Sequence, residues 1–292
     1  MITRLAILLT APSWLLVTAA ATAGLGTILA VLVIFSGGIA SATSADLHYQ
    51  CDSAVGPDPA VTETTTTTTS APPETVTPSD VPTPNPYAEM TVAPGETGVS
   101  NWMRACLPAM RSAPYQLQPL RTADTGFAPE CARQIAMTLV GGATGSAAGA
   151  QTDPARMTAV VISRASATTA TCESSSGTRD DGTALRSGGV AVSDRSDSGS
   201  CPTSRGTGTV VLPDTVAAQS LCGQRVDPAW VSAGDLVYWD YRDYRDYAPT
   251  RVGIAVSATD IVASDPATGV IAQQSIPTGP DVRVKRVLGG WS

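Results

Sequence analysis

The stretch SAGDLVYWDYRDYRDYAPTRVGIAV, from Ser232 to Val256, carries the clearest strand signals in the chain. Its two ends, GDLVYW and RVGIAV, are rich in β-branched and aromatic residues and are bounded by turn formers, which is typical of strands. The same character continues, between Gly, Pro and Asp residues, in DIVASDP, GVIAQQSIP and DVRVKRVL. We therefore expect an antiparallel β meander with hairpin connections in the last part of the chain.

The segment before this meander has helical periodicity. SNWMRACLPAMRSA and PECARQIAMTLVGG carry apolar residues at helical spacings and end near Pro or Gly, so each predicts a short helix. MTAVVISRA, from Met157 to Ala165, predicts a strand. Residues 166–208 are dominated by Ser, Thr, Gly, Asp and Arg and read as a low-complexity insertion. Residues 99–292 are therefore expected to form one small α+β domain.

The N-terminal segment, residues 1–45, is predicted to be a transmembrane helix. No charged residue occurs from Leu5 to Ala45. This uncharged segment is longer than the roughly 20 apolar residues that a bilayer span needs. With Arg4 on the cytoplasmic side, one crossing makes a single-pass protein of the cell membrane whose C-terminal domain is extracytoplasmic. Two short spans, or a signal peptide cleaved near Ala40-Ser41-Ala42, are the alternatives.

Residues 46–98 are predicted to be an extracytoplasmic linker. Thr, Pro and acidic residues dominate from Pro57 to Glu96, and such a composition cannot form a core. We expect this segment to be disordered and extended, and its role as a stalk is a hypothesis.

The composition limits which classes of partner and which cellular compartment we expect for this protein. The formal net charge is -7 and no dense basic patch occurs, which argues against nucleic acid as a partner. None of the 6 cysteines forms a C-x-x-C pair and His48 is the only histidine, so we expect neither a metal site nor a cofactor. In an exported chain the cysteines favour disulfides. Their connectivity is open, with Cys106–Cys131 and Cys172–Cys201 as candidate pairs.

The meander resembles part of a known family. VVLPDTVAAQSLCGQRVDPAWVSAGDLVYW, followed by RVGIAV and DIVASDP, resembles the later half of the NlpC-type cell-wall cysteine peptidases. The resemblance covers about Thr209 to Leu288 and follows the family patterns LP...S..Q...G, PGDLVFF and HVGIYVG. It implies a papain-like fold and, in intact members, cleavage of peptide links in peptidoglycan stems. The matched residues are Leu212, Pro213, Gln219, Gly223, Gly234, Asp235, Leu236, Val237, Val252, Gly253 and Ile254.

The residues that would perform catalysis depart from this family. In this family the nucleophilic cysteine lies at the start of a helix. The candidates here are Cys131 and Cys201. Cys131 opens a plausible helix, whereas the sequence around Cys201 does not predict one. The family's histidine aligns with Arg251, whose guanidinium stays protonated and cannot accept a proton from a thiol. His48 lies outside the matched region, so the resemblance implies a degenerate domain without a Cys–His dyad.

Two further features have alternative interpretations. The repeat DYRDYRDY places Tyr241, Tyr244 and Tyr247 between two strands, where with Arg251 they predict a groove for an acidic peptide or wall fragment. The favoured interpretation of the same repeat is a hairpin tip, lengthened by local duplication and held by its own Asp–Arg pairs. Lys285, the only lysine, lies in the alternating segment VRVKRV and is predicted to be solvated.

The leading hypothesis is a membrane-anchored protein that binds peptidoglycan or envelope proteins without catalysing a reaction. The alternatives are an active peptidoglycan endopeptidase with an atypical base, and a structural subunit of a membrane secretion or transfer complex.

Overall fold

The computed structural model describes residues 44–61, 85–140, 153–167, 172, 201, 209–241, 247–265 and 267–289. The chain divides into two units, Met1–Tyr49 and Gln50–Ser292. Most of the predicted membrane segment, the Thr/Pro-rich residues 62–84 and most of the insertion lie outside the described residues. Within the described residues, no helix combines the length and the apolar character needed to cross a membrane.

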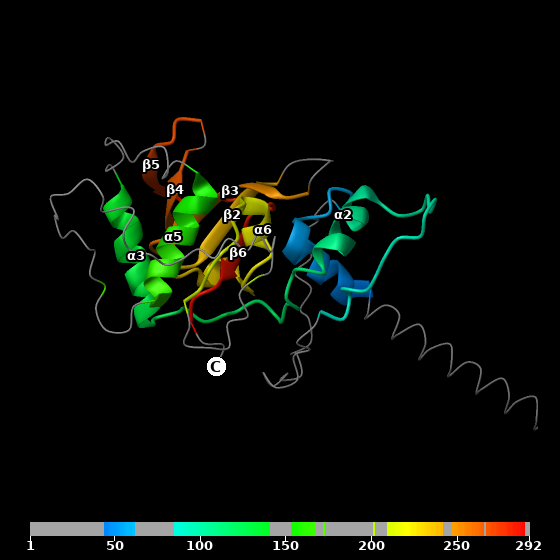
Figure 1. Cartoon of the computed structure of the whole chain (residues 1–292), viewed down its shortest axis with the longest axis horizontal. Coiled ribbons are helices and arrows are strands. Elements are labelled where there is room, and N and C mark those ends of the chain that lie inside the picture. The colour runs from blue at the N-terminus through cyan, green and yellow to red at the C-terminus, as the bar shows by residue number, and fades with distance from the viewer. Residues whose placement is uncertain are drawn as a thin grey trace, which may run out of the picture. The chain divides into compact units, whose positions relative to one another are not determined.

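The second unit contains a six-stranded antiparallel sheet, which lies at the centre of Figure 1. The strand order is β1-β6-β2-β3-β4-β5. The strands are β1 (Gln224–Val226), β2 (Leu236–Tyr241), β3 (Pro249–Ala255), β4 (Asp260–Ser264), β5 (Ile271–Ser275) and β6 (Arg283–Arg286). The five strands predicted in the last part of the chain are therefore confirmed as β2 to β6, and β2 to β5 form the predicted meander. β6 instead crosses back to pair with β2 and β1.

Helices complete the α+β fold. They are α2 (Asn101–Ala109), α3 (Phe127–Leu139), α5 (Pro154–Ala167), α6 (Val216–Ser220) and the short 3-10 helix η2 (Pro228–Trp230). α2 and α3 confirm the two predicted helices. α3, α5 and α6 pack against one face of the sheet (Figure 1).

Each face of the sheet has its own core because side chains alternate along a strand. The helix-side core includes Cys131, Ile135, Val161, Ile162, Leu236, Tyr238, Val252 and Ile254. The core on the other face, which we call the outer-face core, consists of Val226, Val237, Ala255, Ile261, Ala263, Val282 and Val284.

The predicted strand Met157–Ala165 is wrong, because these residues lie inside α5. Asp153 Oδ1 accepts hydrogen bonds from the backbone N–H groups of Ala155 (2.8 Å) and Arg156 (3.4 Å), in the manner of an N-cap. Pro154 then occupies the first helical position, which it favours. The buried residues recur at helical spacing and include Val161, Ile162 and Ala165.

The structure also differs from the predicted linker boundaries. Residues 44–55 are helical, and from Gln50 onward they belong to the same unit as the sheet. Cys51 forms a disulfide with Cys106 of α2, and Trp102 Nε1 donates a 2.9 Å hydrogen bond to the Gly56 carbonyl.

The chain beyond residues 62–84 is attached to the same unit. Asn85 is buried, and its Nδ2 donates to the Ala113 carbonyl at 3.2 Å. Residues 62–84 therefore leave from and return to one unit, so they do not connect the predicted anchor to the domain.

Candidate functional site

The six cysteines form three disulfides, Cys51–Cys106, Cys131–Cys172 and Cys201–Cys222. The candidate pairs Cys106–Cys131 and Cys172–Cys201 are therefore wrong. No cysteine is free. Since a nucleophilic cysteine acts as a thiolate, neither Cys131 nor Cys201 offers that group in this structure.

Arg251 and Cys131 lie on opposite faces of the sheet. Cys131 is fully buried in the helix-side core, which also contains Val252, the residue after Arg251. Arg251 must then share the other face with Gly253, where a Cβ would meet Ile261 and Ala263 of the outer-face core. The position of the family's base and the best placed nucleophile candidate are therefore not brought together.

Arg251 is a surface residue between two acids. Its side chain is 36% exposed, and its guanidinium lies 3.9 Å from Asp240 Oδ2 and 3.9 Å from Asp265 Oδ2. Its cross-strand neighbour on β2 is Trp239. Ion pairs of this length and exposure stabilise a fold little.

Two of the tyrosines predicted to line a groove with Arg251 pack into the fold in the described residues. Tyr241 packs against the helix-side core, and its ring lies on Gly56, where an added Cβ would approach Cδ1 to 2.5 Å. Tyr247 is 7% exposed, and Tyr244 lies outside the described residues. The structure thus leaves Arg251 on the outer face, without Tyr241 beside it.

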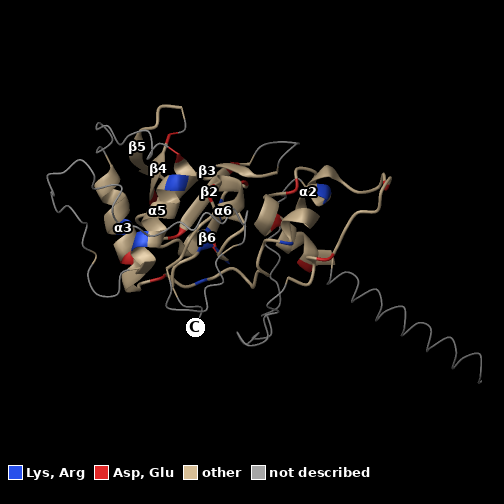
Figure 2. Cartoon of the chain, viewed as in Figure 1, with Lys and Arg blue, Asp and Glu red and all other residues tan. Residues whose placement is uncertain are grey.

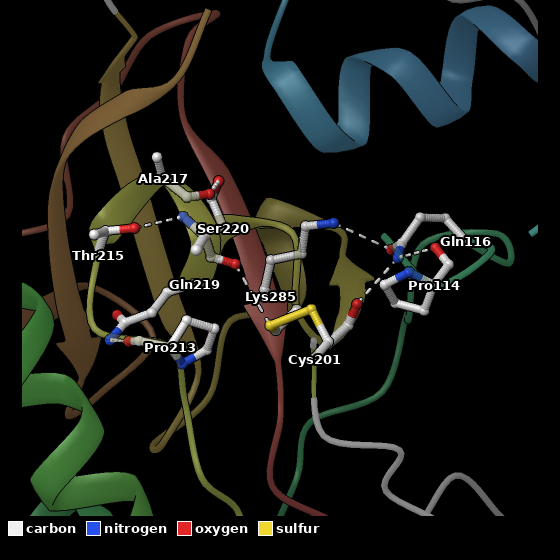
Figure 3. Close-up of a disulfide and its surroundings, with 12 residues drawn as sticks. Pro114, Gln116, Cys201, Pro213, Thr215, Ala217, Gln219, Ser220 and Lys285 are labelled. Carbon is white, nitrogen blue, oxygen red and sulfur yellow. Dashed lines mark hydrogen bonds between the residues drawn. A yellow bond between two sulfur atoms is a disulfide. The ribbon is translucent and has the colours of Figure 1, made fainter. Parts of the chain in front are cut away.

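Residues that match the family's pattern have structural roles here. Gln219 donates from Nε2 to the carbonyls of Ala155 (2.7 Å) and Pro213 (2.8 Å), and its Oε1 accepts from Thr158 at 2.7 Å. These bonds join α6 to α5, and Figure 3 shows Gln219 beside Pro213. Asp235 in turn binds the Arg286 guanidinium with both carboxylate oxygens, at 2.7 and 2.8 Å.

Sequence reasoning missed a buried charged cluster at the β1–β6 edge of the sheet. Lys285, predicted to be solvated, is 1% exposed, so that prediction is wrong. Its Nζ donates to Gln116 Oε1 at 3.2 Å (Figure 3). Burial and the charge of Arg225, opposed by Asp52, lower the pKa of Lys285 to about 7.

Asp52 is the carboxylate of this cluster. One of its oxygens pairs with Arg225 of β1 and the other with Arg283 of β6. Burial would raise the pKa of Asp52, but the charges of Arg225 and Arg283 outweigh burial and lower it. The alternating pattern of VRVKRV predicted that Lys285 is solvated, because nothing in the sequence indicates that residues 50–56 cover this part of the sheet.

This cluster holds elements of the fold together. Lys285 points toward an amide, and no serine hydroxyl bonds to its amine among the described residues. In the same residues, no group of three His, Cys, Asp or Glu side chains can hold a metal ion. Figure 2 shows basic residues scattered over α2, α3, α5 and β6 rather than gathered in one patch.

Comparison with known proteins gave no relatives: no family model, no curated protein and no solved structure matches this chain significantly.

Proposed function

We propose that this protein is an extracytoplasmic, membrane-anchored protein of the cell envelope, whose degenerate NlpC-like domain binds the cell wall without cleaving it. The observation that carries the proposal is the pairing of all six cysteines, which include both nucleophile candidates. Structural disulfides form and persist mainly outside the cytoplasm. The same pairing removes the thiolate that a cysteine peptidase requires.

Residues 50–56 belong to the unit that contains the sheet, and this indicates where the domain lies relative to the proposed anchor. Cys51 lies six positions after Ala45, the end of the predicted anchor, and a chain of that length spans at most about 20 Å. Cys51 is tied by its disulfide to α2. The domain is then held close to the membrane, and not at the end of a Thr/Pro stalk.

The wall-binding surface that we propose is centred on Arg251. A guanidinium binds carboxylates with paired hydrogen bonds, and peptide stems end in carboxylates. Trp239, its neighbour on β2, supplies an aromatic surface beside it.

Co-sedimentation of the full-length protein, in detergent, with purified peptidoglycan tests this function. We expect binding without soluble products, and binding weakened about tenfold by Arg251→Ala, as the loss of a charge-assisted pair implies. Arg121→Ala is the matched control, because Arg121 is also a surface arginine paired with an acid, Asp227 at 3.3 Å.

Soluble wall fragments that disappear with Cys131→Ala would overturn the non-catalytic proposal in favour of the endopeptidase. Absence of wall binding, with co-purification of membrane partners, would instead favour a structural subunit. Labelling of cysteines by a maleimide on unreduced protein would contradict the disulfide argument on which the location rests.

A further inference from the structure

The two edges of the sheet differ in whether another segment of the chain bonds to their backbone. At the β1 edge, the backbone N–H of Leu120 donates to the Arg225 carbonyl (2.9 Å), and the Leu120 carbonyl accepts from Asp227 (3.0 Å). The chain thus satisfies this edge with its own backbone. At the other edge, in the part of the chain that the structure describes, no segment pairs with the outer side of β5.

β5 is open to solvent on both faces. Ile271 is buried, but the four residues from Ala272 to Ser275 are exposed, although side chains of a strand alternate between the faces. Val270, just before the strand, is 54% exposed. Among the described residues, the strand therefore offers its backbone edge without cover from either side.

The backbone groups that point outward belong to Ile271, Gln273 and Ser275. Ile276 donates inward to the Thr259 carbonyl (2.8 Å), and the Val270 carbonyl accepts inward from Asp265 (2.9 Å). Bonding direction alternates along an antiparallel strand, so the even-numbered residues face β4 and the odd-numbered ones face out.

Proteins usually protect such an edge with charged residues, and this one has none. No Asp, Glu, Lys or Arg occurs from Pro266 to Pro280. Charges on an edge strand disfavour pairing with another copy, because they must lose solvation and meet like charges across the new strand pair, most directly at the two-fold axis. An edge without charges lacks this protection against pairing with a second copy.

We propose that β5 is a homodimerisation edge, at which two copies of this chain join their sheets by antiparallel pairing of β5 with β5. With the two-fold axis at Gln273, this residue faces its own copy and Ile271 faces Ser275 of the second copy. Each facing pair exchanges both of its backbone hydrogen bonds, because all three residues point outward. The interface is small, so the dimer is weak and depends on concentration.

Site-specific cross-linking tests this pairing in the membrane-bound, full-length protein. In Gln273→Cys the new cysteine faces its copy across a hydrogen-bonded pair, whose Cα separation of about 5.5 Å permits a disulfide. The natural chain adds no background, because it has no free cysteine. We expect mild oxidation to give a covalent dimer at least tenfold more efficiently than in the control Gln274→Cys, whose partner is Ala272.

Charge substitutions provide the second arm, measured by sedimentation velocity of the full-length protein in detergent. Gln273→Lys and Gln273→Glu should each be monomeric at concentrations where the natural chain dimerises, and their mixture should regain the dimer. A natural chain that stays monomeric overturns the proposal, as does equal cross-linking at positions 273 and 274. A dimer unaffected by either charge would also overturn it, since the contact would then lie elsewhere.

Discussion

At the scale of single residues, the informative positions are polar groups that the fold buries. Lys285 alternates with Val284 in β6 and so looks like a solvated strand residue, yet it is covered by residues from the start of the second unit. Asp52 lies in that cover and neutralises two arginines from different strands. A buried charge without its partner is costly, so these residues determine how firmly residues 50–56 hold to the sheet.

Replacing Lys285 should stabilise the protein in a pH-dependent way. The folded pKa is about 7 and the ordinary value is 10.5, so protonated Lys285 penalises the folded state fully below pH 7. The penalty decreases as the pH rises from 7 to 10.5 and the folded amine loses its proton. We expect Lys285→Met to raise the free energy of unfolding by about 1–3 kcal/mol more at pH 6 than at pH 10.

Chemical denaturation at the two pH values measures this difference. Lys285→Arg is the matched comparison, because its side chain keeps the charge at both pH values and should lose stability relative to the natural chain at pH 10. A gain in Lys285→Met that is equal at pH 6 and pH 10 would show that the amine titrates normally.

Asp52→Asn should cost about 3–5 kcal/mol of stability at neutral pH, because it leaves the buried Arg283 and the partly buried Arg225 without a counter-charge. The control Asp227→Asn breaks an exposed pair with Arg121 and should cost less than about 1 kcal/mol. The folded pKa of Asp52 is lowered, so its contribution is present above the ordinary value of 3.8 and is lost as the pH falls through the lower, folded pKa. Denaturation curves should therefore show the difference from Asp52→Asn shrinking below pH 3.8.

At the scale of elements, the errors and successes of prediction have identifiable causes. The strands of the meander were predictable, because their β-branched runs are bounded by turn formers. Met157–Ala165 contains similar residues, but their cost in a helix is only about 0.5 kcal/mol each relative to Ala. The Asp153-Pro154 start signal and burial against α3 outweigh that cost.

The turn that ends the helix of residues 44–55 offers a matched pair of substitutions. Gly56 and Gly95 both have φ of +83°, but a Cβ at Gly56 would lie 2.5 Å from Tyr241 Cδ1, and one at Gly95 meets nothing within 4 Å. Gly95→Ala should cost about 1 kcal/mol from the backbone alone, and Gly56→Ala more than about 2 kcal/mol. Thermal unfolding followed by tryptophan fluorescence measures both, and equal losses would mean that Tyr241 does not pack on Gly56.

At the scale of the whole molecule, the Thr/Pro-rich segment is an excursion from one unit and not a spacer between an anchor and a domain. Residues before it are joined to residues after it by Cys51–Cys106 and by the pairing of Asp52 with the sheet. Cleavage of the chain within this segment should therefore not release the domain from the membrane.

A protease site that replaces Thr64–Thr69 tests this arrangement. After cleavage, the two fragments should migrate together on a non-reducing denaturing gel and separate after reduction, because one disulfide joins them. The domain should also stay with the membrane fraction. In the control variant Cys51→Ser with Cys106→Ser the fragments should separate without reduction. Release of the domain from unreduced, cleaved membranes would restore the stalk interpretation.

The sequence by itself determined the strands of the meander, the helices α2 and α3 and the absence of a histidine from the region of the family resemblance. These follow from local patterns and from counting residues. Only the tertiary structure decided which cysteines pair, which face of the sheet Arg251 occupies, and that Lys285 is buried. The physical reason is that these features depend on contacts between segments far apart in the chain, such as Cys51 with Cys106 or Asp52 with Arg283, and no local periodicity encodes such contacts.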